Sequence, residues 1–329
     1  MEYTHLGRTG LKVSRLCLGT MAFGQLADEG ESFQIMDRAL ELGINFFDTA
    51  NVYGRPPIGN TEEIIGRWLA QGGRREQIVL ATKVFGQAGP GVNDRGLSAY
   101  HIRRACEDSL RRLQTDHIDL YQMHHVERET PWEEIWQAME QLVREGKLLY
   151  AGSSNFAAWH IAMAQRSAAE RHFMGLVSEQ SRYNLASRTI ELEVIPACMA
   201  LGIAVLPYGP LRGGILAGGM GAPTDAPGAP EGAKGRRSSE GAQKLFEKHR
   251  PQVEAYEALC RASGIDPAHM AHAWMLQRPG ITAPILGPRT TDQLEHSVRS
   301  LEVKLSEEIL FQLDEIWPGP GTAPEAYAW

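Results

Sequence analysis

The sequence predicts an α/β protein built as a (β/α)8 TIM barrel, and three observations lead to this fold. Short apolar runs alternate with amphipathic helical segments, and the count is eight strands, each followed by a helix. The length of 329 residues suits one such barrel with insertions. No shift in composition marks a second domain, so residues 1–329 are expected to form a single domain. A doubly wound sheet is the alternative, weakened because no G-x-G-x-x-G follows the first strand.

The first half of the chain predicts a β-hairpin and then four strand–helix units. Tyr3 to Val13 contains a glycine-bearing turn between two short extended runs, which is typical of a hairpin. Polar N-cap residues predict two helix starts, at Asn60, with Glu63 three residues on, and at Thr130, with Glu133 three residues on. Apolar runs predict strands, and 3.6-residue periodicity predicts helices. The strands are expected at 16–18, 44–47, 78–82 and 117–123, and the helices at 32–42, 61–70, 98–113 and 130–145.

The second half repeats the alternation with one long interruption. Residues 212–240 are rich in Gly, Ala and Pro and predict a long loop on the cofactor side, either a lid or a disordered segment. The tail 318–329 is predicted to be a loop. The two helices after the last strand are extra C-terminal helical segments. Strands are expected at 148–152, 175–179, 203–207 and 282–286, and helices at 157–169, 190–201, 250–263, 267–277, 291–300 and 306–316.

Composition excludes several classes of protein. The chain is 43% hydrophobic and 22% charged with a net charge of −7, which is typical of a globular protein without general affinity for nucleic acid. Four widely spaced cysteines without a C-x-x-C motif indicate neither a zinc site nor a disulfide scaffold. The N-terminus lacks a secretory signal, and no apolar run is long enough to span a membrane. The cytoplasm is therefore the expected compartment; the oligomeric state is not readable, and a homo-oligomer remains open.

Polar residues stand where the second, third and fourth predicted strands end. They are Asp48, Lys83 and His124, and Tyr53 follows Asp48 on the same loop. The carboxyl ends of barrel strands converge on one mouth, so these four side chains are predicted to share a site. Each has a simpler explanation: Asp48 as a turn residue, Tyr53 as a packed aromatic, Lys83 as a solvated strand end and His124 as a core histidine.

These motifs resemble the aldo-keto reductases over nearly the whole chain. The matching segments are Leu6 to Ser14, Leu18 to Met21, Phe47 to Ala50 with Tyr53-Gly54, Ala81 to Lys83, Ile118 to His124, Gly152 to Phe156 and Gln180 to Asn184. The family's Asp, Tyr, Lys and His tetrad is matched by Asp48, Tyr53, Lys83 and His124. The resemblance implies an NADPH-dependent oxidoreductase that reduces an aldehyde or ketone to an alcohol.

The expected chemistry agrees with these residue types. A free tyrosine has a pKa of about 10, and a neighbouring ammonium lowers it. Tyr53 is therefore expected to be the general acid and Lys83 the group that tunes its pKa. Asp48 would keep the Lys83 ammonium charged, and His124 would donate a hydrogen bond to the substrate oxygen. The adjacent His125 is expected to be structural or to support the site from behind the residues that contact substrate.

The resemblance also implies a set of residues that bind NADPH. Tyr208 matches the aromatic that stacks on the nicotinamide, and Arg289 matches a contact to the 2′-phosphate. His296 and Ser297 stand where the family often has Glu-Asn, which is a departure at the expected adenine contacts. The predicted cofactor-binding residues are Gly19, Thr20, Met21, Asp48, Ser154, Asn155, Gln180, Tyr208, Gly209, Leu211, Gly213, Leu216, Gly287, Arg289 and Gln293, although Gln293 also fits a capping box with Thr290.

The small-molecule carbonyl substrate is not specified by these motifs. The aromatic tail is predicted to fold over the pocket or else to pack elsewhere on the barrel or at a subunit contact. Lys234, Arg236 and Arg237 could fold over the cofactor phosphates or belong to a solvated loop. His269 and His272 share a helix face, but no carboxylate partner is evident and no metal is expected. The predicted lining of the mouth is Phe23, Tyr53, Phe85, Tyr327 and Trp329.

Other functions are weighed against carbonyl reduction. Within the family, the sequence around His124 and the tail resemble a bacterial subgroup that includes reductases of nucleotide-linked keto- or enoyl-hexoses in deoxysugar biosynthesis. Potassium-channel β-subunits, which bind NADPH as regulatory partners, resemble the chain as well. The intact tetrad, and the expectation that no inactivation segment precedes the barrel, favour an enzyme. A metal-dependent barrel hydrolase is disfavoured because Lys83 would repel a metal.

Overall fold

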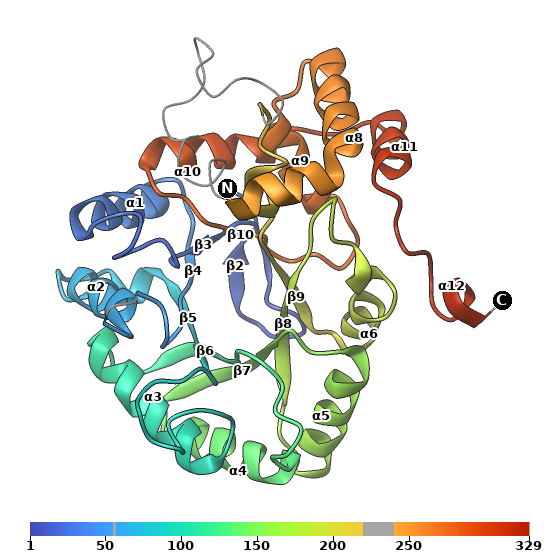
Figure 1. The fold of residues 1–329 in the computed structure, drawn as a ribbon. Helices are drawn as coiled ribbons and strands as arrows, with labels where there is room; N and C mark the ends of the chain where they lie inside the picture. Colours follow the sequence, from blue (N-terminus) through green and yellow to red (C-terminus); the bar gives the residue numbers. More distant parts are fainter. Residues whose placement is uncertain (55–56, 220–239, 329) are drawn as a thin grey trace.

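The computed structural model describes residues 1–54, 57–219 and 240–328. Its centre is a closed barrel of eight parallel strands in the order β10-β3-β4-β5-β6-β7-β8-β9, seen end-on in Figure 1. The strands follow one another in chain order around the ring, so each connection crosses the outside of the barrel. The predicted (β/α)8 barrel is therefore confirmed. The barrel strands are β3 (Cys17–Gly19), β4 (Phe46–Asp48), β5 (Val79–Val84), β6 (Ile118–Met123), β7 (Leu148–Ser154), β8 (Leu176–Arg182), β9 (Ala204–Tyr208) and β10 (Ile285–Leu286).

Helices surround this barrel in Figure 1. The apolar positions that repeat along them pack against the outer face of the strands, as helical periodicity requires. In the described part of the connection between β9 and β10 lie helices α8 and α9, and α10 and α11 follow β10 as the extra C-terminal segments. The helices are α1 (Glu29–Glu41), α2 (Asn60–Leu69), α3 (Ala99–Leu113), α4 (Trp132–Arg144), α5 (Ala158–Glu170), α6 (Val194–Leu201), α8 (Glu240–Ser263), α9 (Pro267–Leu276), α10 (Thr291–Val298), α11 (Glu307–Ile316) and α12 (Glu325–Ala328).

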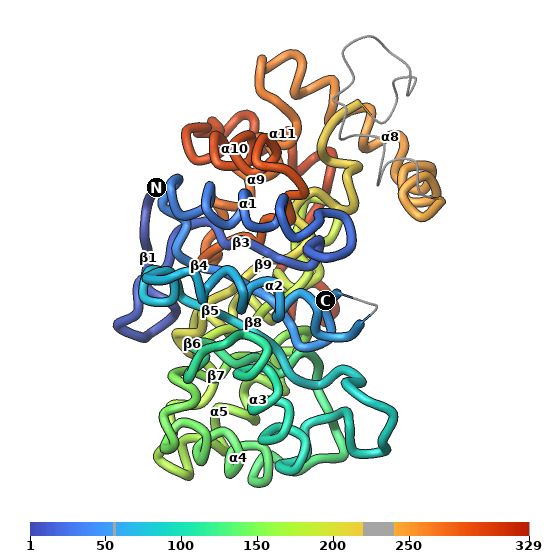
Figure 2. The backbone as a smooth tube through the Cα atoms, turned by 90° about the vertical axis from the view of Figure 1, so that its left-hand side faces the viewer, coloured from blue at the N-terminus to red at the C-terminus, as the bar shows by residue number. Residues whose placement is uncertain are grey.

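The predicted hairpin closes one end of the barrel. It consists of β1 (Tyr3–His5) and β2 (Lys12–Ser14), paired antiparallel. Leu6 and Val13 are fully buried with the side chains that fill the barrel interior, among them Phe46 and Leu120. Figure 2 shows β1 at the left-hand end of the barrel. Because the hairpin closes this end of the barrel, the open mouth lies at the other end, where the strands have their carboxyl ends.

Two of the predicted helix starts are wrong in detail. The N-cap of α2 is Gly59, with φ of 85°, and no side chain caps this helix. The neighbouring Glu62 is buried. It accepts a hydrogen bond from Thr82 at 2.6 Å and pairs with Arg112, so its carboxylate is used inside the protein and does not cap the helix. The N-cap of α4 is Pro131, because the Thr130 hydroxyl donates to Glu127 at 2.8 Å rather than capping the helix.

The two regions predicted to be loops, 212–240 and 318–329, are each described only in part by the structure. Residues 220–239, with Lys234, Arg236 and Arg237, and Trp329 lie outside the described residues. The tail was expected to be a loop throughout, but residues 325–328 form the short helix α12. Figure 1 shows α12 outside the ring of helices, beyond α6. Among the helices that the structure describes, none has the length and apolar character needed to cross a membrane.

Candidate active site

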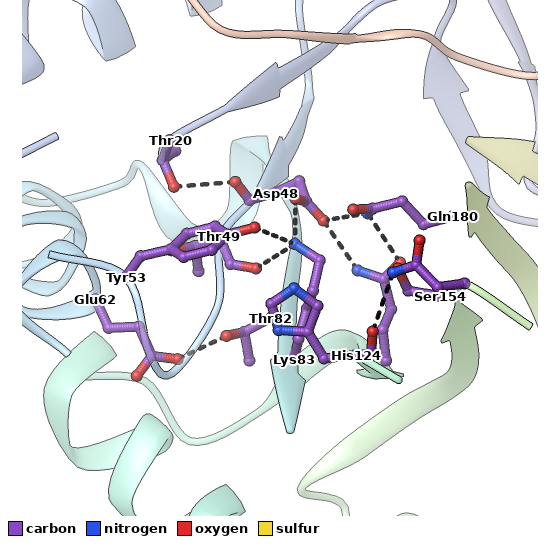
Figure 3. Close-up of polar contacts among 12 residues, drawn as sticks. Thr20, Asp48, Thr49, Tyr53, Glu62, Thr82, Lys83, His124, Ser154 and Gln180 are labelled. Carbon is purple, nitrogen blue, oxygen red and sulfur yellow. Dashed lines mark hydrogen bonds and ion pairs between the residues drawn. The ribbon is translucent and has the colours of Figure 1, made fainter. Parts of the chain in front are cut away.

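Three neighbouring strands bring the predicted tetrad together at the open mouth. Asp48 is the last residue of β4, Lys83 lies near the end of β5, and His124 follows β6. Tyr53 stands on the loop after β4. Figure 3 shows the four side chains converging on one region, with the Lys83 ammonium between Asp48 and Tyr53.

Lys83 is the centre of this arrangement. Its side chain is fully buried, and Nζ lies 2.5 Å from Oδ1 of Asp48. The same nitrogen donates to the backbone oxygen of Thr49 at 2.8 Å and lies 3.4 Å from the Tyr53 hydroxyl. A buried ammonium needs compensating oxygens, and these three supply them. The geometry therefore favours a charged Lys83 held against the phenol.

For Lys83 and for Tyr53 alike, burial and the main neighbouring charge shift the pKa in opposite directions. Burial acts to lower the pKa of Lys83, but the Asp48 carboxylate and the Tyr53 phenol, through charge and hydrogen bonds, together more than offset it, and the net pKa is raised. Burial raises the pKa of Tyr53, and the Lys83 ammonium offsets this only in part. The expected net lowering of the Tyr53 pKa is therefore wrong for this structure, because desolvation of the phenolate outweighs the ammonium.

His124 is neutral at physiological pH. Burial, and then the positive charge of Lys83, lower its pKa to about 3. Its ring lies edge-on to the Tyr53 ring, with the centroids 5.9 Å apart. A neutral imidazole carries one N–H, so His124 can donate one hydrogen bond at the mouth. His125 points elsewhere: it is exposed, its Nδ1 lies 3.1 Å from the Val126 oxygen, and its ring packs beside Phe85.

Two glutamines hold the second oxygen of Asp48. Gln122 donates to Oδ2 at 2.9 Å and Gln180 donates to it at 2.8 Å. Gln180 also donates to Gln122 Oε1 at 3.2 Å. Gln180 was predicted to contact the cofactor, but here its amide nitrogen is directed at Asp48. Gln122 was not singled out from the sequence, although a polar residue between Tyr121 and Met123 in a buried strand was an available signal.

A second group of side chains lies across the mouth on β7, β8 and β9. The Tyr208 hydroxyl donates to Asn155 Oδ1 at 2.9 Å, and Asn155 Nδ2 donates to the His124 oxygen at 3.3 Å and to Ser154 Oγ at 3.0 Å. Asn155 has a left-handed φ of 61°. Beneath it, Glu179 accepts hydrogen bonds from Ser153 and from the Phe156 N–H, and burial raises its pKa to about 7.

The remaining predicted cofactor residues form two further groups around the mouth. Thr20 donates to the Asp48 backbone oxygen at 2.9 Å between the tightly packed Gly19 and the exposed Met21. Gly209 and Gly213 have φ values of 69° and 70° and open space where a Cβ would stand. Leu216 is buried and Leu211 partly buried beside them.

Gln293 forms hydrogen bonds at the start of α10, in the segment that follows β10. The Gln293 N–H donates to Thr290 Oγ1 at 3.2 Å, so Thr290 caps α10. Gln293 Oε1 accepts from the Arg289 N–H at 3.0 Å. The Thr290 half of the predicted capping box is therefore confirmed, whereas the Gln293 side chain bonds the residue before the N-cap. Gly287 is exposed, with open space at its Cβ position.

One of the two predicted histidines, His269, lies closer to a carboxylate than expected. Asp266, His269 and His296 bring ligand-type atoms within 4.8 Å of one another. His296 Nε2 lies 3.1 Å from Asp266, and His269 Nε2 lies 2.7 Å from the His296 oxygen, so these atoms already bond within the group. His272 is separate: it is buried, and neither ring nitrogen has a partner among the described residues.

The predicted aromatic lining is only partly placed at the mouth. Phe23 is fully buried in the core, so it cannot line the mouth. Phe85 is partly buried and has φ of 149°. Tyr327 is 65% exposed and donates its hydroxyl to Glu193 at 3.0 Å, just before α6. For Tyr327, the structure therefore agrees with the alternative in which the tail packs elsewhere on the barrel.

Comparison with known proteins places this geometry in a family. Residues 15–318 match the family described as the aldo/keto reductase family. The chain is 55% identical to the uncharacterized oxidoreductase YrpG of Bacillus subtilis (strain 168), over 100% of both chains. It is 33% identical to versiconal hemiacetal acetate reductase of Aspergillus parasiticus, over 96% of both. A probable voltage-gated potassium channel subunit beta of Arabidopsis thaliana is 32% identical over 99% of this chain and 100% of its own. The chain therefore belongs to the aldo/keto reductase family of oxidoreductases.

Proposed function

We propose that residues 1–329 form one barrel domain that reduces the carbonyl group of a small aldehyde or ketone with NADPH. The observation that carries this proposal is the placement of Lys83 Nζ, 2.5 Å from Asp48 and 3.4 Å from the Tyr53 hydroxyl, at the mouth of the barrel. Such an arrangement places an ammonium where it can stabilise the phenolate that is left when Tyr53 gives up its proton.

The residues around the mouth fit a nicotinamide dinucleotide. Tyr208 presents a partly buried ring at the end of β9, anchored by Asn155. Gly209 and Gly213 leave their backbone open to a phosphate, since a Cβ at either position would meet nothing. Asn51 is a further polar group to be satisfied, because its side-chain nitrogen and oxygen are both buried without a described partner. Ser154, Asn155, Tyr208 and Arg289 would hold the cofactor, which supplies a hydride when bound.

Residues of the protein supply the proton for the carbonyl oxygen and stabilise the charges that form. Tyr53 donates its hydroxyl proton to the carbonyl oxygen as that oxygen gains negative charge. The Lys83 ammonium stabilises the phenolate that remains, and Asp48, held by Gln122 and Gln180, keeps Lys83 charged and in position. His124, with a pKa of about 3, stays neutral and donates a hydrogen bond to the same oxygen.

The test is a titration with NADPH and with NADH, followed by quenching of tryptophan fluorescence, on the wild type and on Arg289→Ala. We expect NADPH to bind tightly and to bind less tightly to the variant, while NADH binding is unchanged. Aldehydes, ketones and nucleotide-linked keto-hexoses are then screened for oxidation of NADPH. Failure to bind either nucleotide would remove the proposed mechanism.

A regulatory, NADPH-binding subunit is the second candidate. It is favoured by the 32% identity to a protein named as a probable potassium channel subunit. The two candidates differ in turnover, because a binding subunit would take up NADPH without oxidising it in the presence of any screened carbonyl. The buried contact between Asp48 and Lys83, with Tyr53 beside it, favours the enzyme.

A further inference from the structure

An arginine lies at the mouth on the strand that carries Gln180. Arg182 ends β8 and pairs in register with Tyr208 of β9. Side chains two residues apart on a strand share a face, so Arg182 lies on the same side as Gln180, whose amide reaches Asp48. The Arg182 guanidinium lies 5.6 Å from the centroid of the Tyr208 ring. Arg182 therefore lies beside the ring whose hydroxyl donates to Asn155.

A second arginine follows β9 in an unusual backbone conformation. Arg212 has φ of 48°, a left-handed value that favours glycine, and its N–H bonds to the Gly209 oxygen at 3.0 Å. This turn begins directly after Tyr208, and the positive charge of Arg182 acts on the Arg212 guanidinium. Arg212 is partly buried, and its Nε has no described hydrogen-bond partner.

Arg182 is exposed and Arg212 is partly buried, and both differ from Arg188 and Arg112, which form ion pairs with carboxylates. Arg188 pairs with Glu191 and Asp314, and Arg112 pairs with Glu62. Within residues 1–54, 57–219 and 240–328, neither Arg182 nor Arg212 has a carboxylate partner within ion-pair distance. Burial, and then the charge of Arg182, lower the pKa of Arg212. The two positive guanidinium groups at the barrel mouth repel each other, and an anion bound between them would remove this repulsion.

We propose that Arg182 and Arg212 bind a carboxylate or phosphate group of the carbonyl substrate, so that the preferred substrates are anionic. Guanidinium groups match both anions through paired N–H donors. Arg212, which is partly buried, gains more from such a bond than the exposed Arg182. The position beside Tyr208 places the anion at the mouth while the carbonyl approaches Tyr53 and His124. This inference rests on the proposed carbonyl reduction and specifies its substrate class.

The test compares two aldehydes of the same shape that differ in charge. They are 4-formylbenzoate and its neutral methyl ester. Glyceraldehyde 3-phosphate and glyceraldehyde form a second pair. We expect the wild-type protein to prefer each anionic member by about 10-fold or more in kcat/KM, the range for a charge-assisted hydrogen bond. Added KCl should reduce this preference, because salt screens a partly exposed charge.

The variants are Arg182→Gln, Arg212→Gly and their combination. Glycine suits the left-handed backbone at 212, so loss of the side chain is separated from strain. We expect the double variant to lose the preference for the anion, with kcat/KM for the methyl ester and the dissociation constant of NADPH each changed less than about 2-fold. Arg166→Gln is the matched control, since Arg166 is an exposed arginine on α5.

The outcomes separate this inference from the proposed function. Reduction of the methyl ester by the wild type supports carbonyl reduction, whichever aldehyde is preferred. Equal loss on the acid and the ester, or weaker NADPH binding without a change in charge preference, would overturn the inference and assign the arginines to structure or to the cofactor phosphates. If neither aldehyde is reduced, calorimetric binding of 4-formylbenzoate decides: binding lost in the double variant supports the anion site, and no binding to the wild type overturns it.

Discussion

Gln122 Nε2 donates a hydrogen bond to Asp48 Oδ2 at 2.9 Å, on the opposite oxygen from the one that Lys83 contacts. Both residues are buried, so the bond is made to a charged group away from water. The Asp48 carboxylate is thereby fixed between an amide and an ammonium. A fixed Asp48 carboxylate in turn helps to hold Lys83 in position.

Replacement of Gln122 by Met, which has a similar volume, should therefore affect both stability and chemistry. We expect a loss of about 1.5–3 kcal/mol in the free energy of unfolding, the range for a hydrogen bond to a charged group. We also expect kcat to fall, because Lys83 is no longer held beside Tyr53. Urea unfolding and steady-state kinetics measure these effects. Gln141→Met, at an exposed position on α4, is the control; equal effects in both variants would contradict this role for Gln122.

The fold and the tetrad were predictable because each depends on local sequence. Alternating apolar runs determine the barrel, and a polar residue at a strand end determines which side chains reach the mouth. Gln122 was missed because an amide inside a strand has no motif; its role follows from the cross-barrel contact with Asp48. The net pKa of Tyr53 was mispredicted because burial, which the sequence does not show, outweighs the nearby ammonium.

Tyr53→Phe removes the proton donor and little else. We expect kcat with an aldehyde to fall about 10²–10⁴-fold, the usual contribution of general acid catalysis. The fluorescence titration with NADPH should be unchanged, since the phenol hydroxyl faces Lys83 at 3.4 Å. Tyr3→Phe, which loses an exposed hydroxyl bonded to Gly43, is the matched control. Retention of most of the activity in Tyr53→Phe would require another proton donor.

Tyr327→Phe tests the position of the tail. The hydroxyl bonds Glu193 at a largely exposed site, where such a bond contributes little. We expect kcat/KM for every aldehyde tested to stay within about 2-fold of the wild type and the free energy of unfolding to change by less than about 0.5 kcal/mol. A large change in KM would mean that the tail contacts the substrate after all. Steady-state kinetics with a bulky and a small aldehyde separate the two results.

His272 should make the protein sensitive to acid. Burial, and then the charges of His269 and His296, lower its pKa to about 3, while Asp266 acts in the opposite direction. In the unfolded chain a histidine takes up a proton below about pH 6.5, whereas the folded state excludes it until about pH 3. The unfolded state therefore binds more protons in this window, and stability falls as the pH is lowered through it.

His272→Leu removes that proton uptake and also two unpartnered buried nitrogens. At pH 5 we expect the variant to gain up to about 2 kcal/mol relative to the wild type, beyond any difference at pH 7, from the 1.4 kcal/mol that each pKa unit represents. Urea unfolding at pH 5, 6 and 7 measures the change. The exposed His172, replaced by Asn to suit its φ of 55°, is the control and should leave the slope with pH unchanged. Parallel curves for wild type and His272→Leu would show that His272 is protonated, or reached by water, in the folded protein.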